Sequence, residues 1–342
     1  MTPPPPPYPS AARTSAFVGQ DDKLEQIRQS LAHPGTDFRL LLIRAPGGMG
    51  KSRLLEEVMT YVDYPDLIWA KDNKDDTRSW WKNYPGEQRP VVSVPIDVID
   101  TRLHDRNRFI AALHESLRQY PGVTFPTYRR MEEKLLSRSA SGAQLTEMRE
   151  AQQDAANAFV DDLGRVATKR RVGILVDTVE RLSYPPLDRL RQLGLLSPDQ
   201  FQTRVHVWLE TLIADRQALQ NVTLILAGRA GEKEGEYFFR LIADAAARHG
   251  IVPQILDLEE LSEGQVEAFY EALKEETESR SGKGTNYGHV ASHFRAMADR
   301  AELLHFYTKG IPVRLSLYGQ IIIDGGRVPH LLTLGPAEAR RR

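Results

Sequence analysis

A lysine, a hydroxyl group and three glycines lie close together in the stretch APGGMGKS, residues 45–52. The apolar run FRLLLIR precedes this stretch, and KSRLLEEVMTYV, which has helical spacing, overlaps its end. Glycines let backbone N–H groups turn inward towards a phosphate, and the following helix points its positive end at the same anion. The ammonium of Lys51 can reach the β- and γ-phosphates of a nucleotide, and the hydroxyl of Ser52 can ligate Mg²⁺. The stretch therefore predicts a phosphate-binding loop.

The loop fits the pattern G-x-x-x-x-G-K-[ST] at every fixed position but the first, where Ala45 replaces glycine. Alanine keeps the side chain small, so we expect the turn to form. The alternative is a glycine-rich turn with an incidental lysine, but the strand before and the helix after favour phosphate binding. The residues expected to contact the nucleotide here are Pro46, Gly47, Gly48, Met49, Gly50, Lys51, Ser52 and Arg53.

Two carboxylates follow a second apolar run in VGILVDTVERL, residues 172–182. Asp177 ends the run, and an acid at the end of a buried strand can hold Mg²⁺ through water, so Ser52 and Asp177 are the expected metal residues. The next residue is Thr178 instead of an acidic base, which leaves Glu180 as the nearest carboxylate that could orient or deprotonate water. The alternatives are a helix cap at Asp177 and a solvated acid at Glu180.

An arginine ends a third apolar run, NVTLILAGRAG, residues 221–231. Where such a strand lies between the loop strand and the acid strand, its end faces the γ-phosphate. Arg229 could then donate a charge-assisted fork to phosphate oxygens; the alternative is a surface arginine after a glycine turn. The expected catalytic residues are Lys51, Glu180 and Arg229.

Apolar runs alternate with helical patterns along the first part of the chain, which predicts a parallel sheet wound on both faces. Expected strands cover residues 38–44, 66–70, 90–100, 172–177 and 222–228, with another from 252. Expected helices cover residues 21–31, 51–62, 107–117, 199–219 and 236–249. From Leu261 the strands cease, and Ser262 with Gln265 forms a capping-box pattern. The fold class is therefore α/β, a P-loop NTPase three-layer sandwich followed by a small α-helical domain.

The expected domain boundaries follow these patterns. Residues 1–13 are a proline-rich leader without order, residues 14–260 a nucleotide-binding domain with a helical insertion at about 127–171, residues 261–330 a helical domain, and residues 331–342 a tail. The insertion has a weak point at SASGA, residues 139–143.

The composition of the chain bears on its cellular compartment and on the partners that it could bind. The 342 residues carry a formal net charge of −1, which argues against a general attraction to nucleic acid or anionic membranes. The chain has no cysteine, which excludes disulfides and thiolate metal sites and fits a reducing compartment. The start of the sequence lacks the pattern of a signal peptide, and no apolar run is long enough to span a membrane. We expect a cytoplasmic protein.

Taken together, these motifs resemble the STAND class of AAA+-related P-loop ATPases, which includes NACHT and plant-resistance-type members. FVGQDDKLEQI, residues 17–27, is similar to the family's hhGR-E motif, with Gln20 in place of the usual arginine; APGGMGKS, LVDTVE and LILAGR are similar to Walker A, Walker B and sensor 1. Gly310-Ile311-Pro312 is similar to the family's G-x-P motif. The resemblance covers about residues 17–325 and implies that Phe17 and Val18 frame the adenine, with Pro312 packed near it.

The resemblance implies an ATP/Mg²⁺-binding switch with slow hydrolysis, in which ATP or ADP changes the angle between two domains and so self-association or binding of a sensor or effector protein. One alternative is an AAA+ ATPase that acts on nucleic acid as a loader or transposition regulator. Others are a metabolic kinase, against which the helical domain argues, and an ATP-binding module without hydrolysis. Family members usually continue into a winged helix and a sensor array, so this sequence could be a fragment, a split component or a minimal member.

Overall fold

The computed structural model describes residues 17–323, apart from 34, 63, 66–78, 85–87, 143, 184–203, 232 and 282–287. The chain divides into two compact units. The sheet unit comprises residues 23–46 and 51–257, and the helical unit comprises the residues up to 22, residues 47–50 and those from 258 onwards. The expected leader, the expected strand at 66–70 and the expected tail lie outside the described residues.

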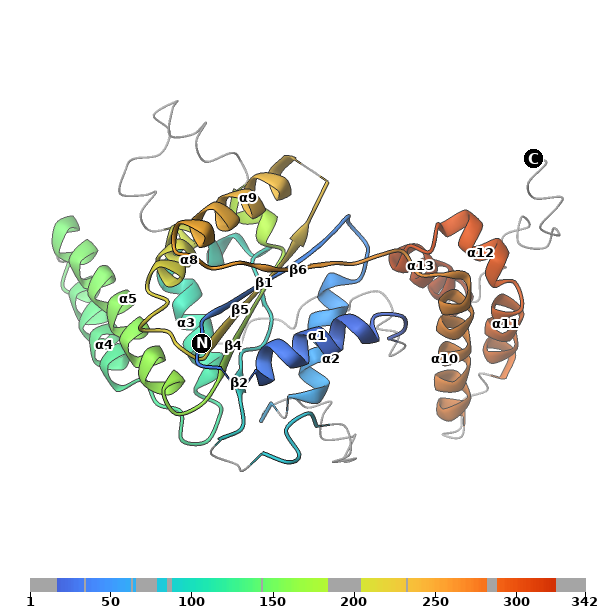
Figure 1. Ribbon diagram of the computed structural model, residues 1–342, viewed down its shortest axis with the longest axis horizontal. Helices are drawn as coiled ribbons and strands as arrows, with labels where there is room; N and C mark the ends of the chain where they lie inside the picture. The colour runs from blue at the N-terminus through green and yellow to red at the C-terminus, as the bar shows by residue number, and fades with distance from the viewer. Residues whose placement is uncertain are drawn as a thin grey trace. The chain divides into compact units, whose positions relative to one another are not determined.

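Six parallel strands form the sheet of the sheet unit (Figure 1). They are β1 (Arg39–Ala45), β2 (Val91–Val92), β3 (Ile96–Asp97), β4 (Val172–Asp177), β5 (Val222–Arg229) and β6 (Gln254–Asp257). Their order is β2-β4-β5-β1-β6, with β3 also beside β4. The apolar runs of β1, β4 and β5 are buried because these strands occupy the centre of the sheet. The α/β fold with a parallel sheet is confirmed, and β5 lies between β1 and β4 as expected.

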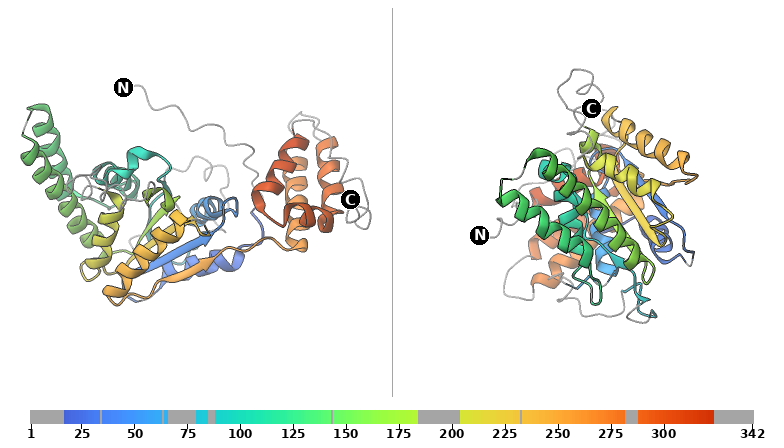
Figure 2. Two further views of the ribbon diagram at one scale, coloured as in Figure 1. Left: turned by 90° about the horizontal axis from the view of Figure 1, so that it is seen from above. Right: turned by 90° about the vertical axis from the view of Figure 1, so that its left-hand side faces the viewer.

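Helices flank the sheet (Figures 1 and 2). They are α1 (Asp21–Ala32), α2 (Lys51–Tyr61), α3 (Arg106–Leu117), α4 (Pro126–Ala140), α5 (Leu145–Ala167), α8 (Val205–Ala214) and α9 (Lys233–Arg248), with short 3₁₀ helices η3 (Thr101–His104) and η4 (Val179–Ser183). Helix α2 contacts β1, β4 and β5, while α9 contacts β5 and η4. In α1 the residues Leu24, Ile27 and Leu31 are buried, as their helical spacing predicts.

The strand expected over residues 90–100 is broken into β2 and β3, and Pro95 lies between the two pieces. Proline has no N–H to donate to the neighbouring strand, so the ladder is interrupted there. Ser93, just after β2, is hydrogen-bonded to β4. Its N–H donates to the carbonyl of Gly173, and its Oγ accepts from the N–H of Leu175 at 2.9 Å. The pairing resumes at β3, where Asp97 is in register with Asp177.

The helix expected over residues 199–219 is shorter in the structure, because α8 ends at Ala214, and residues 199–203 lie outside the described part. After Ala214 the N–H groups of Ala218 and Leu219 donate to the carbonyl of Asp215, which forms a turn that leads into β5. Leu219 is fully buried by this turn. The helical periodicity of residues 215–219 therefore reflects the burial of Leu219, while the rest of the turn is exposed or half-buried.

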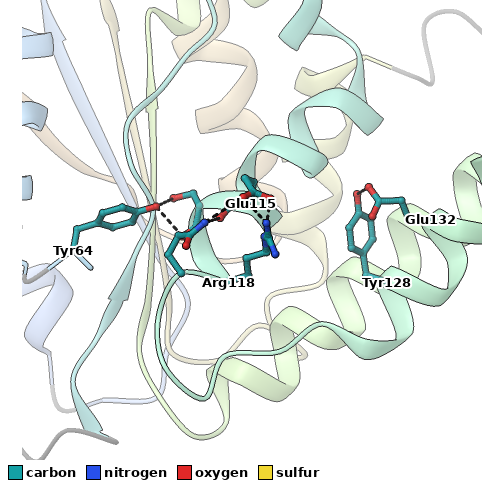
Figure 3. A network of polar contacts seen from close by, with 7 residues as sticks. Tyr64, Glu115, Arg118, Tyr128 and Glu132 are labelled. Atoms are coloured by element: carbon teal, nitrogen blue, oxygen red, sulfur yellow. Dashed lines mark hydrogen bonds and ion pairs between the residues drawn. The ribbon is translucent and has the colours of Figure 1, made fainter. Parts of the chain in front are cut away.

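The expected insertion consists of α4 and α5, which pack against each other, and the chain between them passes through Gly142 at φ +68°. The N–H of Tyr128 donates to Asp162 at 2.8 Å, and its hydroxyl donates to Glu132 at 3.0 Å (Figure 3). Nearby, the Tyr64 hydroxyl donates to the carbonyl of Ser116 in α3, and the Ser116 Oγ accepts from the N–H of Val94. The first two hydrogen bonds lie within the pair α4 and α5, while the other two link α3 to Tyr64, which follows α2, and to Val94, which lies between β2 and β3.

Four helices form the core of the helical unit: α10 (Glu263–Ser281), α11 (Gly288–Ala298), α12 (Ala301–Thr308) and α13 (Pro312–Ile323). Their buried apolar cluster includes Leu261, Tyr270, Phe294, Leu304 and Leu315. The capping box is present, since the Ser262 N–H donates to Gln265 at 2.8 Å and the Gln265 N–H donates to the Ser262 Oγ. In the part of the chain that the structure describes, no helix is long and apolar enough to cross a membrane.

Replacing Gly310 with alanine should destabilise the helical unit by more than about 2 kcal/mol. Gly310 has φ +65°, and an added Cβ would lie 2.1 Å from the carbonyl oxygen of Leu261, whose N–H donates to the Gly310 carbonyl. Gly264→Ala is the matched control, because an added Cβ there meets no heavy atom within 4 Å. Chemical unfolding of the two variants measures the difference. Equal stabilities would show that residue 310 tolerates a side chain.

Candidate functional site

The carboxyl ends of the central strands gather the chemically active residues of the sheet unit at one edge. Five residues separate the end of β1 from Lys51 and Ser52, which start α2, while Asp177 ends β4 and Arg229 ends β5. Because parallel strands share one direction, these ends lie at the same edge of the sheet. The order of the strands places β5 between the other two.

Lys51 is held at the base of the predicted loop. Its Nζ donates to the carbonyl oxygens of Ala45 at 2.9 Å and Pro46 at 2.8 Å, and the residue is 8% exposed. These two acceptors position the ammonium beside the first turn of α2, whose free N–H groups also favour an anion. The arrangement fits the binding of a phosphate group.

Ser52 and Asp177 form the polar pair expected of a magnesium site. The side chain of Asp177 is hydrogen-bonded to that of Ser52, and it accepts from the N–H of Thr178 at 2.8 Å. Burial raises the pKa of Asp177 to about 6; the negative charges of Asp97 and Glu180 also raise it, while the hydrogen bonds from Ser52 and Thr178 lower it. A hydroxyl beside a carboxylate supplies oxygen ligands of the kind that Mg²⁺ prefers, so these residues fit the ion.

Asp97 is a neighbour of this pair that the sequence analysis missed. It ends β3, is in register with Asp177, and its exposed side chain accepts from the N–H of Ile99 at 3.0 Å. The N–H of Val98 donates to the Asp177 carbonyl, which holds the two strand ends together. Within the described ranges, no three His, Cys, Asp or Glu side chains converge to hold a metal ion by themselves. A magnesium ion at this edge would therefore depend on phosphate oxygens for part of its coordination.

The contribution of Asp177 to the stability of the ligand-free protein should fall as the pH rises from about 4 to 6. In this window folded Asp177, with a pKa of about 6, keeps a proton that the unfolded chain, with a pKa near 3.8, has lost. At pH 7 the buried carboxylate should cost roughly 2–3 kcal/mol of folding free energy. Asp177→Asn should therefore raise the free energy of unfolding at pH 7, and raise it less at pH 4.

Urea unfolding at both pH values measures this effect, with Asp154→Asn on the exposed side of α5 as the control. An Asp177→Asn protein no more stable than the control at pH 7 would contradict the assigned burial. In the same variant, ATP binding should lose part of its dependence on Mg²⁺.

Glu180 and Arg229 are paired with each other. Thr178 has φ +61°, which turns the chain sharply after β4 into η4 and directs Glu180 towards the end of β5. The Arg229 N–H donates to Glu180 Oε2 at 3.0 Å, and its Nε lies 3.4 Å from Oε1. Glu180 is 6% exposed, so Arg229 contacts both oxygens of a buried carboxylate. The residue expected to orient water and the residue expected to contact the γ-phosphate thus form one ion pair.

Gly228 makes this close approach possible. An added Cβ there would lie 2.7 Å from Val179 Cγ2 and 3.0 Å from Glu180 Oε2. The Gly-Arg sequence at the end of β5 is therefore needed for the packing of η4 against the strand, whatever its role towards a ligand.

The glycines of the loop belong to the helical unit. Gly48 and Gly50 have φ of +84° and +87°, the left-handed backbone that glycine adopts without strain, while Met49 is buried. Within this unit the carbonyl of Gly48 accepts from the N–H of Val313 at 3.1 Å, and an added Cβ on Gly48 would lie 2.4 Å from Val313 Cγ1. Pro312 occupies the first position of α13, where its missing N–H has no cost.

The N-terminal motif also joins the helical unit. Val18 packs against its apolar cluster, and Phe17 is half-buried. The carbonyl of Gly19 accepts from Gln265 Nε2 at 3.1 Å, and Gln20 donates to the carbonyl of Glu259 at 3.4 Å. The roles expected for these residues towards adenine stay predictions.

The structure thus brings Lys51, Ser52, Asp177, Glu180 and Arg229 to one edge of the sheet unit. It places Phe17, Val18, Gly47, Gly48, Met49, Gly50 and Pro312 in the helical unit. Exposed Pro46 contributes its carbonyl to Lys51, and Arg53 pairs with Glu57 at 2.8 Å along its own helix. Asp97 and the left-handed Thr178 were missed. Asp97 ends a strand, as Asp177 does, in the sequence Pro-Ile-Asp of residues 95–97. Once the order of the strands is known, this position indicates that Asp97 lies beside Asp177.

Solved structures similar to this chain are ATPases and replication proteins. A Walker-type ATPase of Pyrococcus abyssi matches with a TM-score of 0.48 and 14% identity, over 94% of this chain and 71% of that protein. Drosophila ORC bound to DNA matches with a TM-score of 0.45 and 14% identity, over 95% and 67%. The ORC2 protein of Aeropyrum pernix, solved in ADPNP and ADP complexes, matches with a TM-score of 0.41 and 12% identity, over 91% and 68%.

No protein-family model and no curated protein matches the sequence. With these identities and TM-scores, the similar structures carry no argument about function. The chain's own strand order, its loop between β1 and α2, and the acid that ends β4 are the features of a P-loop NTPase fold.

Proposed function

We propose that this protein is an ATP- and Mg²⁺-binding ATPase of the STAND type, which works as a conformational and oligomerisation switch with slow hydrolysis. The observation that carries the proposal is the edge of the sheet unit, where Lys51, Ser52 and Asp177 lie with donors and acceptors suited to phosphate and Mg²⁺. Bound Mg²⁺ would neutralise phosphate charge.

The ion pair between Glu180 and Arg229 suggests how hydrolysis is kept slow. In the ligand-free protein the carboxylate that would accept a proton from water instead accepts a hydrogen bond from the backbone N–H of Arg229 and forms an ion pair with its guanidinium. When the Arg229 guanidinium turns to phosphate oxygens, Glu180 is released to orient water. The step then needs both a γ-phosphate and a rearrangement of η4 or β5, which supports slow turnover.

The proposed switch depends on nucleotide contacts that we expect in both the sheet unit and the helical unit. A nucleotide that binds Lys51 and also contacts Pro312, Phe17 or Val18 favours whatever arrangement lets it make both sets of contacts. Exchange of ATP for ADP removes the contact with Arg229 and changes that preference. The arrangement selected by the nucleotide would in turn determine whether a surface for self-association, or for a sensor or effector protein, is available.

The direct test is the mass of the full chain in solution with ATP, with ADP and without nucleotide, measured by light scattering. A mass that changes between ATP and ADP supports the switch. Identical masses, together with identical affinities for the two nucleotides, would leave only a nucleotide-binding domain. Adding double-stranded DNA in the presence of ATP tests the expectation against nucleic acid, which stays a prediction.

A further inference from the structure

A second polar pocket lies at the opposite edge of the sheet unit from Lys51 and Asp177. Its volume is about 520 Å³, within the range of pockets that hold small ligands. The chain segments that lead into β1, β5 and β6 form its walls, together with Ser30 of α1. Because β1 runs from this pocket at Arg39 to the loop after Ala45, the two sites are separated by roughly 20 Å.

Two arginines line this pocket without a binding partner. Arg39 starts β1, and Arg216 lies in the turn before β5. Both side chains are half-buried, and neither has a hydrogen bond or ion pair with any residue that the structure describes. Asp37 also lines the pocket but forms no ion pair with either of them. A half-buried guanidinium without a hydrogen bond or an ion pair has lost part of its hydration, so a ligand is a ready explanation.

The surroundings add positive charge and hydrogen-bonding groups. Burial lowers the pKa of Arg39; the negative charge of Asp37 raises it, and the positive charge of nearby Arg171 lowers it. The amides of Gln217 and Gln220 line the same pocket and have no hydrogen-bond partner among the described residues. The lining therefore offers two cations, one carboxylate and amides that can both donate and accept.

We propose that this pocket binds a small phosphorylated ligand, with Arg39 and Arg216 holding the phosphate and Asp37, Gln217 and Gln220 contacting hydroxyl groups of its carrier. A phosphate monoester has three acceptor oxygens and up to two charges, so two guanidinium forks can bind it together. A carboxylate has only two oxygens, which one fork satisfies. The volume exceeds what a lone phosphate needs and leaves room for a sugar-sized carrier.

The test uses the full chain with Lys51→Ala, so that binding at the phosphate loop does not contribute. Calorimetric titrations at low ionic strength compare ribose 5-phosphate, inorganic phosphate, citrate and uncharged ribose. We expect saturable binding of ribose 5-phosphate, weaker binding of phosphate and citrate, and no binding of ribose. Added Arg39→Ala or Arg216→Ala should each weaken ribose 5-phosphate about tenfold, the scale of one charged hydrogen bond.

Arg130→Ala on the exposed face of α4 is the matched control and should bind like its parent. Thermal unfolding confirms that each variant is folded, and Arg216→Lys should recover part of the affinity if charge is what matters. Hydrogen exchange should slow at residues 37–41 and 250–254 when ribose 5-phosphate is bound. The proposal is overturned if no phosphate-bearing probe binds at millimolar concentration, if citrate binds as tightly, or if the two arginine variants match the control.

Discussion

Lys51→Ala should abolish ATP binding without unfolding the chain. The ammonium is the charged group expected at the β- and γ-phosphates, and loss of two charged hydrogen bonds should weaken binding by about 10²–10⁴-fold. The fold should survive, because the bonds from Lys51 to the carbonyls of Ala45 and Pro46 each contribute about 1 kcal/mol. Calorimetric titration with ATP and Mg²⁺ gives the affinity.

Lys134→Ala on α4 is the matched control, because it removes the same charge from an exposed helix outside the site. Urea unfolding of both variants separates a binding defect from a folding defect. A folded Lys51→Ala protein that titrates like the control would exclude the loop as the nucleotide site.

Glu180→Gln should keep ATP binding and lose turnover by about 10²–10⁴-fold, the usual contribution of a general base. Glutamine has the same shape and can still accept the hydrogen bond from the Arg229 N–H, so the packing of η4 should persist. Phosphate release and nucleotide affinity should be measured on the same sample, with Glu133→Gln on α4 as control. Unchanged hydrolysis would show that Glu180 is not the general base, so that another residue or none has this role.

Arg229→Ala tests whether Arg229 contacts the γ-phosphate or only pairs with Glu180. If Arg229 contacts the γ-phosphate, the variant should lose about 1–3 kcal/mol of ATP binding and much less ADP binding. The backbone N–H of residue 229 still donates to Glu180 in this variant, but the ion pair with the guanidinium is lost. Equal losses for both nucleotides would make Arg229 a β-phosphate contact or a residue of the fold.

The sequence was sufficient to predict the central sheet. The apolar runs of β1, β4 and β5 are long and buried on both faces, so their pattern does not depend on neighbours. The loop before Lys51 and the acid at Asp177 follow from fixed spacing. The position of β5 between β1 and β4 came from the order of motifs, and the strand pairing confirms it.

Features that depend on contacts between distant segments were missed. The pairing of Asp97 with Asp177 requires the order of the strands, which the expected strand over residues 90–100 does not give by itself. The ion pair between Glu180 and Arg229 depends on the positive φ of Thr178, which a threonine rarely adopts. The pocket around Arg39 and Arg216 is formed by three loops that no local pattern connects.

We propose that nucleotide binding is transmitted from the phosphate loop to the helical unit. Hydrogen exchange measured with and without ATP and Mg²⁺ tests it most directly, in the wild-type chain and in Pro312→Ala. We predict slower exchange at residues 47–52 and also across the helices between residues 261 and 323, with a smaller effect on those helices in Pro312→Ala. Protection of residues 47–52 with no change in the helices of the wild-type chain would contradict the switch and leave a plain ATP-binding domain.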